Sequence, residues 1–193
     1  MIHEIPLDAR ALIFDLDGTL LDTMAVHRQA WRETMEEYGI QVTQELFDSF
    51  GGQTTPDIVS GLEDRYGRTL PAEEIARAKD QAFVRHAPLI QPIMPVLEIA
   101  HHYAEHMPLG VATNERFGVA NIVMRTAGIS HLFQAMVTFD EVTEPKPAPE
   151  MFLECARRLG VPASACHVFE DSRFGIAAAE AAGMTVTDVT TLL

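Results

Sequence analysis

Short apolar runs alternate with helical patterns along most of the chain. A short apolar run without an internal break is typical of a strand buried on both faces of a parallel sheet. Such runs recur at residues 11–15, 109–112, 135–139, 166–169 and 185–189. Apolar residues at helical spacing lie between or beside these runs, at residues 95–105, 116–127, 149–159 and 173–182. This alternation predicts an α/β fold, in which helices cover both faces of a parallel sheet.

The segment between the first and second apolar runs is far too long for a simple strand-to-helix connection. Its content is helical, because apolar and aromatic residues repeat at helical spacing in successive stretches. The repeats are Trp31, Met35 and Tyr38, then Ile58, Leu62 and Tyr66, then a stretch that Pro71 opens and that runs to about residue 86. We therefore expect a small helical cap at residues 20–91, and a core built from residues 1–19 and 92–193.

Composition and charge narrow the class of protein. With 193 residues, of which 47% are hydrophobic, the chain has enough apolar residues for one sizeable core and a small accessory lobe. A formal net charge of −14 disfavours binding to nucleic acid or to anionic lipid. A small anionic substrate remains compatible with this charge if a local pocket is positive. We expect a monomer that binds a small molecule, with no nucleic-acid or membrane partner.

Targeting signals and cysteine usage favour a cytoplasmic protein. No apolar stretch approaches the roughly 18 residues of a membrane span, and residues 1–10 lack the basic-then-apolar pattern of a signal peptide. Cys155 and Cys166 form no CxxC pair and have no histidine at zinc-ligand spacing. A disulfide framework or a zinc site is therefore not expected.

The segment Asp15-Leu16-Asp17-Gly18-Thr19 directly follows the first predicted strand. Open α/β sheets bind their ligands at this end of their strands. Residues two apart in an extended chain point the same way, so Asp15 and Asp17 are expected to direct their carboxylates into one site. Carboxylates this close repel each other unless they share a cation or a proton. The pattern indicates a hard-metal site or a proton-sharing pair, and a plain Asp–Gly turn is the structural alternative.

Three later polar features each follow a predicted strand. Thr113 and Asn114 offer a hydroxyl and an amide that can hydrogen-bond phosphate oxygens. Lys146 stands between two prolines, which restrict the backbone around a positive charge. Glu170 and Asp171 add two acids of the kind that bind magnesium. Each feature alone is also typical of a helix cap or a solvated side chain, but the ends of parallel strands converge at one sheet edge.

In this order, the four strand-end signals resemble the haloacid dehalogenase superfamily, and the resemblance extends from residue 11 to about residue 188. It implies that Asp15 is the nucleophile, which forms an aspartyl phosphate, and that Asp17 is the general acid and then the base. Thr113 corresponds to the family's hydroxyl position and Lys146 to its catalytic and phosphate-binding lysine, with Asn114 beside them as a further substrate-binding residue. The fold that it implies is a Rossmann-like core with a small cap inserted after the first strand.

The same resemblance implies a bound Mg²⁺. We expect its ligands to come from Asp15, Asp17, Glu170 and Asp171, with Asp17 using its backbone carbonyl. The helical insertion is similar to the small-cap subgroup, which includes beta-phosphoglucomutase and many sugar phosphatases. The stretches HRQAWRE, KPAPEMFLECARRLGV and FEDSRFGIAAAEAAGM look closest to bacterial phosphatases that act on fructose 1-phosphate and 6-phosphogluconate. The sequence therefore predicts a magnesium-dependent phosphatase acting on a small phosphorylated sugar or related metabolite.

Two rival functions and one ambiguous residue remain at this point. A sugar phosphomutase needs a cation in the cap for a second phosphate, but the glycine turn at residues 51–55 reads GGQTT, without the arginine of related mutases. Arg85, on the last predicted cap helix, is the alternative cation. A non-catalytic binding or regulatory protein would have lost an essential group, yet all are present. His27 is either a substrate-binding partner of Asp17 or a histidine packed on a helix face.

Overall fold

The computed structural model describes residues 5–193. Residues 1–4, which the predicted core and the search for a signal peptide include, lie outside the described residues. Within residues 5–193, the main sheet has five strands in the order β5-β4-β1-β6-β7, all parallel. The strands are β1 (Ala11–Phe14), β4 (Leu109–Thr113), β5 (Ala135–Thr138), β6 (Cys166–Glu170) and β7 (Thr185–Asp188). The predicted α/β class and the five strand positions are confirmed.

Side chains of the central strand β1 alternate between two apolar layers. Leu12 and Phe14 are buried in a cluster with α5 (Met94–Ala104) and α6 (Phe117–Thr126). Ala11 and Ile13 are buried in a second cluster with residues of α7 (Glu150–Leu159) and α8 (Arg173–Ala181). A strand with both faces buried explains the unbroken apolar run at the start of the chain.

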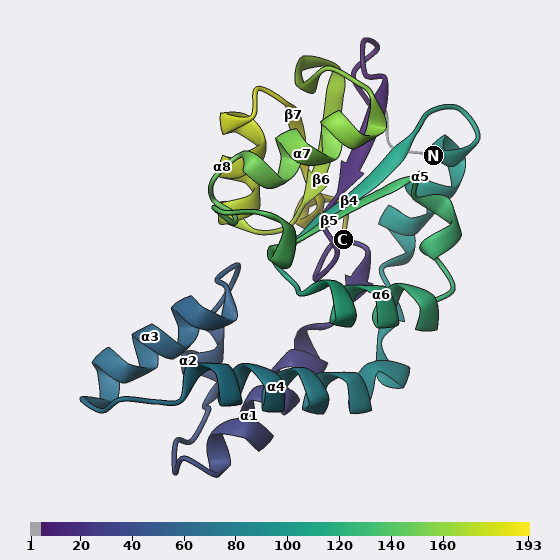
Figure 1. Cartoon of the computed structure of the whole chain (residues 1–193). Helices are drawn as coiled ribbons and strands as arrows, with labels where there is room; N and C mark the ends of the chain where they lie inside the picture. The colour runs from purple at the N-terminus through teal and green to yellow at the C-terminus, as the bar shows by residue number, and fades with distance from the viewer. Residues whose placement is uncertain (1–4) are drawn as a thin grey trace.

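The segment after β1 folds into four helices that gather beyond one end of the sheet (Figure 1). They are α1 (Met24–Glu36), α2 (Gln44–Asp48), α3 (Thr55–Tyr66) and α4 (Ala72–His86). They enclose a separate apolar cluster built around Trp31, Met35, Leu62 and Ile75. The predicted helical insertion is confirmed, although α2 was not predicted, because its five residues are too few to show helical periodicity.

A narrow neck connects the insertion to the sheet. The strands β2 (Leu21–Asp22) and β3 (Gln91–Pro92) pair antiparallel across the two ends of the insertion. Val26 of α1 and Phe83 of α4 extend from the insertion into the apolar cluster of the sheet. The cap is therefore anchored by strand pairing and by apolar contact, and the boundaries expected at residues 20 and 91 remain a prediction.

Short 3₁₀ helices complete the secondary structure. They are η1 (Ala87–Leu89), η2 (Ser130–Leu132), η3 (Phe139–Glu141), η4 (Ala163–Ala165) and η5 (Val189–Leu192). β5 ends one residue earlier than predicted because Thr138 and Glu141 form a reciprocal cap that starts η3. Every helix among residues 5–193 is too short or too polar to cross a bilayer.

Candidate active site

A cavity of about 760 Å³ lies between the cap and the carboxyl ends of the strands. Asp15 directly follows β1, Thr113 ends β4 and Glu170 ends β6, so the topology of the parallel sheet brings these residues to one edge. The walls of the cavity include every residue that the sequence marked for the site: Asp15, Asp17, His27, Thr113, Asn114, Lys146, Glu170 and Asp171. The predicted convergence of the four strand-end features is therefore observed.

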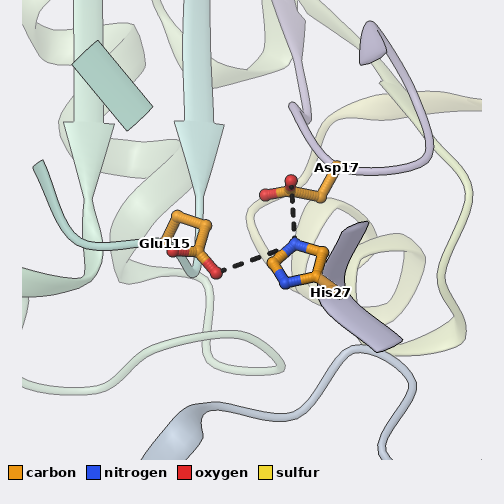
Figure 2. A group of neighbouring side chains, drawn as sticks. All are labelled: Asp17, His27 and Glu115. Carbon is orange, nitrogen blue, oxygen red and sulfur yellow. Dashed lines mark hydrogen bonds and ion pairs between the residues drawn. The ribbon is translucent and has the colours of Figure 1, made fainter. Parts of the chain in front are cut away.

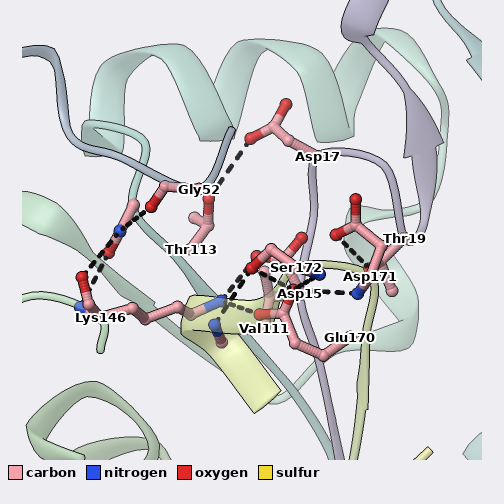
Figure 3. Close-up of polar contacts among 12 residues, drawn as sticks. Asp15, Asp17, Thr19, Gly52, Val111, Thr113, Lys146, Glu170, Asp171 and Ser172 are labelled. Atoms are coloured by element: carbon pink, nitrogen blue, oxygen red, sulfur yellow. Dashed lines mark hydrogen bonds and ion pairs between the residues drawn. The ribbon is translucent and has the colours of Figure 1, made fainter. Parts of the chain in front are cut away.

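Lys146 supplies a positive charge between two carboxylates in the core half of the site (Figure 3). Its buried ammonium donates to Asp15 Oδ1 and to Glu170 Oε2, each at 2.7 Å. Burial alone would lower the pKa of Lys146, but the Asp15 and Glu170 carboxylates outweigh burial and raise this pKa. Lys146 is thus a fixed positive charge beside Asp15.

Glu170 is fully buried and organises the turn that follows β6. Its Oε1 accepts from the backbone N–H groups of Asp171 and Ser172, both at 3.0 Å, and from the Ser172 hydroxyl at 3.1 Å. Burial would raise the pKa of Glu170, but Lys146 and these hydrogen bonds hold it below its usual value. Ser172 Oγ also accepts from Gly175 N–H at 3.1 Å, which makes it the N-cap of α8.

The carboxylates of Asp15, Glu170 and Asp171 form a cluster suited to a cation. One oxygen from each lies within 4.8 Å of the others. Burial, and then the charge of Glu170, raises the pKa of Asp15 well above its usual value and that of Asp171 to about 7. Gly18, with φ +84°, lies so close to Asp171 that a Cβ would overlap its carboxylate. A hard divalent cation such as Mg²⁺ fits this crowded all-oxygen donor set, because it would offset the repulsion.

Asp17 faces a different set of neighbours from Asp15. Its Oδ1 lies 3.1 Å from His27 Nε2 (Figure 2), and its Oδ2 accepts from the Thr113 hydroxyl at 3.4 Å. Burial would raise the pKa of Asp17, but the hydrogen bond and the charge of His27 outweigh it, so this pKa is lowered. Two carboxylates only two residues apart thus have opposite electrostatic surroundings, which is typical of a pair with separate catalytic roles.

The contacts of His27 include the packing expected of one interpretation and the contact with Asp17 expected of the other. Its ring stacks on Phe83 of α4, with centroids 4.2 Å apart and planes 27° apart, as expected of a packed helix-face histidine. The same ring contacts Asp17 through Nε2. Its position on α1 makes His27 a cap residue in direct contact with the core.

Residues 12–189 match the family described as haloacid dehalogenase-like hydrolase. The chain belongs to the haloacid dehalogenase-like hydrolase family. It is 39% identical over 180 residues to the fructose-1-phosphate phosphatase YqaB of Escherichia coli, a match that covers 92% of this chain and 95% of that relative. The predicted family is thus confirmed, and relatives named as phosphatases agree with the predicted enzyme class, a phosphoric monoester hydrolase.

Solved structures agree with this assignment. CbbY from Rhodobacter sphaeroides, solved with phosphate, has a TM-score of 0.84 and 26% identity, and the match covers 92% of this chain and 84% of that one. The beta-phosphoglucomutase of Clostridium difficile has a TM-score of 0.80 and 25% identity, over 95% of this chain and 87% of that one. The chain therefore shares its Rossmann-like core with an inserted cap with these solved structures. The structures that it resembles include a hydrolase and a beta-phosphoglucomutase.

Asn114 has a structural role in this family member that its sequence position did not indicate. Its amide nitrogen donates to the backbone oxygens of Gly52, at 3.3 Å, and Lys146, at 3.5 Å, and its oxygen accepts from Lys146 N–H at 3.2 Å. The side chain thus connects the glycine turn of the cap to the loop that carries the lysine. Its expected contact with phosphate stays a prediction.

Arg85 does not supply the cap cation that a mutase would need. Its guanidinium pairs with Glu33 of α1 at 3.0 Å, and the side chain is 60% exposed and absent from the cavity walls. The suggestion that Arg85 serves the site is therefore wrong in this hydrolase. Sequence reasoning also missed Lys79 and Glu115, which both line the cavity. A signal for Lys79 existed, since it lies one helical turn from both Ile75 and Phe83 on the apolar face of α4.

Proposed function

We propose that this chain is a magnesium-dependent phosphatase that hydrolyses a small phosphorylated sugar or related metabolite through an aspartyl phosphate on Asp15. The observation that carries the proposal is the buried ammonium of Lys146, held 2.7 Å from both Asp15 and Glu170 in the wall of a cavity that core and cap residues line together. A fixed cation beside a carboxylate nucleophile is what phosphoryl transfer requires.

In the first step, a carboxylate oxygen of Asp15 attacks phosphorus, and the bond from phosphorus to the sugar oxygen breaks. Asp17 gives its proton to the departing sugar oxygen. Lys146 balances the charge on Asp15 and on the phosphoryl oxygens throughout. Mg²⁺, when held by Asp15, Asp171 and the backbone carbonyl of Asp17, would reduce the repulsion between the two anions.

In the second step, Asp17 removes a proton from water, and the water oxygen attacks the phosphorus of the aspartyl phosphate. The bond from phosphorus to Asp15 breaks, which releases inorganic phosphate and restores the carboxylate. The lowered pKa of Asp17 keeps it in the carboxylate form that this step needs. A dianionic phosphate ester close to Asp17 would raise its pKa and favour the protonated form that the first step needs.

The side chains of the cap favour a substrate with hydroxyl groups and a single phosphate. Beside apolar side chains such as Trp31, Phe47 and Phe50, the cap contributes polar and mostly neutral residues to the cavity wall: Gln44, Asp48, Ser49, Gln53 and Thr55. Among the described residues, the lysines and arginines that line it are Lys79, Lys146 and Arg173, and both lysines are already paired with carboxylates. A second phosphate would therefore lack a free lysine in the cap. This favours hydrolysis over a phosphomutase reaction, and fructose 1-phosphate and 6-phosphogluconate are the first substrates to test.

The test is a turnover screen over phosphorylated sugars, polyols and nucleotides, with and without magnesium, followed by phosphorus NMR. We expect inorganic phosphate to accumulate in step with substrate loss, without a bisphosphate primer. An isomeric sugar phosphate formed with little phosphate release would identify a mutase instead. A full panel without turnover would favour the binding or regulatory alternative.

A further inference from the structure

An ion pair that no step of the proposed reaction uses crosses from the cap to the core. Lys79, on α4, is only 2% exposed, and its ammonium donates to Glu115 Oε1 at 2.8 Å. Glu115 lies in the core, on the turn between β4 and α6. Burial alone would lower the pKa of Lys79, but neighbouring carboxylates, Glu115 first among them, raise it. Because a buried charge without its partner is strongly destabilising, this pair favours the arrangement in which the cap lies on the core.

The pair also reaches the proposed acid–base group. Glu115 Oε1 lies 3.9 Å from His27 Nε2, and the same nitrogen lies 3.1 Å from Asp17 Oδ1 (Figure 2). Phe83, one helical turn after Lys79 on α4, stacks against the face of the same imidazole. One helix of the cap thus supplies both the cation that holds Glu115 and the ring that supports His27.

A proton carried on His27 Nε2 can be donated to only one of these two carboxylates at a time. As long as Lys79 neutralises Glu115, the shorter contact of this nitrogen is with Asp17. Without the ammonium of Lys79, Glu115 would be an uncompensated carboxylate close to Nε2 and would compete with Asp17 for the imidazole. The position of His27 over Asp17 therefore depends on Lys79, which acts on it through Glu115.

We propose that Lys79 is a positioning residue: it neutralises Glu115 and so leaves His27 to Asp17, which completes the acid–base site only when the cap lies on the core. This inference rests on the proposed phosphatase function, in which Asp17 protonates the leaving oxygen. It assigns no catalytic contact to Lys79 or to Glu115.

Arg85 provides a matched control, because it lies on the same helix and pairs with a glutamate of α1 without leaving the cap. The variants are Lys79→Met and the double variant Lys79→Met/Glu115→Gln, with Arg85→Met as the control that also removes one cation from α4. Glu115→Gln keeps the size of the side chain but removes its charge, so the double variant leaves no unpaired buried carboxylate if Lys79→Met alone fails to fold. Each variant is assayed with magnesium on fructose 1-phosphate and on p-nitrophenyl phosphate.

We expect kcat for the sugar phosphate to fall about ten- to hundredfold in Lys79→Met, within the usual range of acid–base assistance or below it. In Lys79→Met/Glu115→Gln it should return to near the wild-type value, because the double variant has no competing carboxylate. The fall for p-nitrophenyl phosphate should be much smaller, because its leaving group needs little protonation. Arg85→Met should match the wild type on both substrates. Equal losses on the two substrates would mean that the pair only stabilises the cap, and would overturn the positioning role.

Nitrogen NMR of the His27 imidazole provides a readout that does not depend on turnover. We expect its Nε2 resonance to shift or broaden in Lys79→Met, and to stay close to the wild-type position in Lys79→Met/Glu115→Gln and in Arg85→Met. An unchanged resonance in Lys79→Met would refute the proposal even in an active enzyme. A shifted resonance in a protein that hydrolyses no phosphate ester would support the positioning role and refute the phosphatase function.

Discussion

Two buried lysines meet carboxylates on opposite sides of the cavity, and they are held in place in different ways. Lys146 is in the core, where Asp15 directly follows β1 and Glu170 ends β6 of the same sheet. Lys79 is in the cap, and its partner Glu115 belongs to the core. The first pair forms whenever the sheet folds, whereas the second also requires the cap to lie on the core. We infer that the sheet builds the nucleophile side of the site and that cap docking completes the acid–base side.

The largest effect should come from the core side. Asp15→Asn keeps the shape of the side chain but removes the nucleophilic carboxylate, so turnover should fall at least roughly a thousandfold. The variant should remain folded, because an amide oxygen can still accept from Lys146. Turnover assays and far-UV circular dichroism check the two expectations. Near-normal turnover would contradict the covalent mechanism. It would also contradict the inference that the sheet builds the nucleophile side of the site.

Metal removal should have an effect of similar size, again on the core side. A chelator in excess should abolish phosphate release, and added magnesium should restore it, because Asp15, Glu170 and Asp171 would otherwise repel an anionic substrate. Calcium prefers longer bonds and more ligands, so it should fail to restore activity. The fluorescence of Trp31 in the cap serves as a control that the fold survives chelation. Full activity in the chelator would rule out the assigned metal site.

A smaller and more selective loss should come from the cap side. His27→Gln should lower kcat for a sugar phosphate by roughly ten- to a thousandfold, since it removes the imidazole beside Asp17. Reactivity toward p-nitrophenyl phosphate should fall much less. Steady-state kinetics on the two substrates gives the ratio of losses, and thermal melting monitors the fold. If both rates fall equally and the melting temperature drops, His27 is only a packing residue on Phe83.

The same contrast explains how much of the site could be predicted from the sequence. Asp15 and Glu170 were predictable because each directly follows an apolar strand, and parallel topology then brings them to one edge. Lys146 was predictable because two prolines mark a restricted loop next to that edge. These inferences need only local pattern and topology.

The docking of the cap was not predictable in this way. The pairing of Lys79 with Glu115 depends on how two separately packed units meet. Glu115 directly follows Asn114, but Lys79 lies far in sequence from every motif that the sequence analysis recognised. The contact of Asn114 with Gly52 of the cap also arises from this docking. Short elements were missed for a simpler reason, since the two residues of β2 carry no detectable periodicity.

The smallest expected effect is a difference in the free energy of unfolding between variants of the two lysines. Lys146→Met would leave Asp15 and Glu170 buried together without their cation, and strand ends fixed by the sheet cannot separate to admit water. We expect a loss of about 3 kcal/mol in the free energy of unfolding, at the lower end of the range for breaking a buried pair. Lys79→Met should cost about 2 kcal/mol less than Lys146→Met, because the cap can shift and let water reach Glu115.

Urea unfolding in the presence of a chelator measures both losses without interference from bound metal. Circular dichroism follows the whole fold, and Trp31, the single tryptophan of the chain and a buried cap residue, follows the cap. In Lys79→Met the tryptophan transition should move to lower urea than the circular dichroism transition, because the weakened contact is the one that ties the cap to the core. In Lys146→Met the two transitions should move together. Equal losses with coincident transitions in both variants would mean that cap and core form one cooperative unit, and that the two lysines are held in the same way.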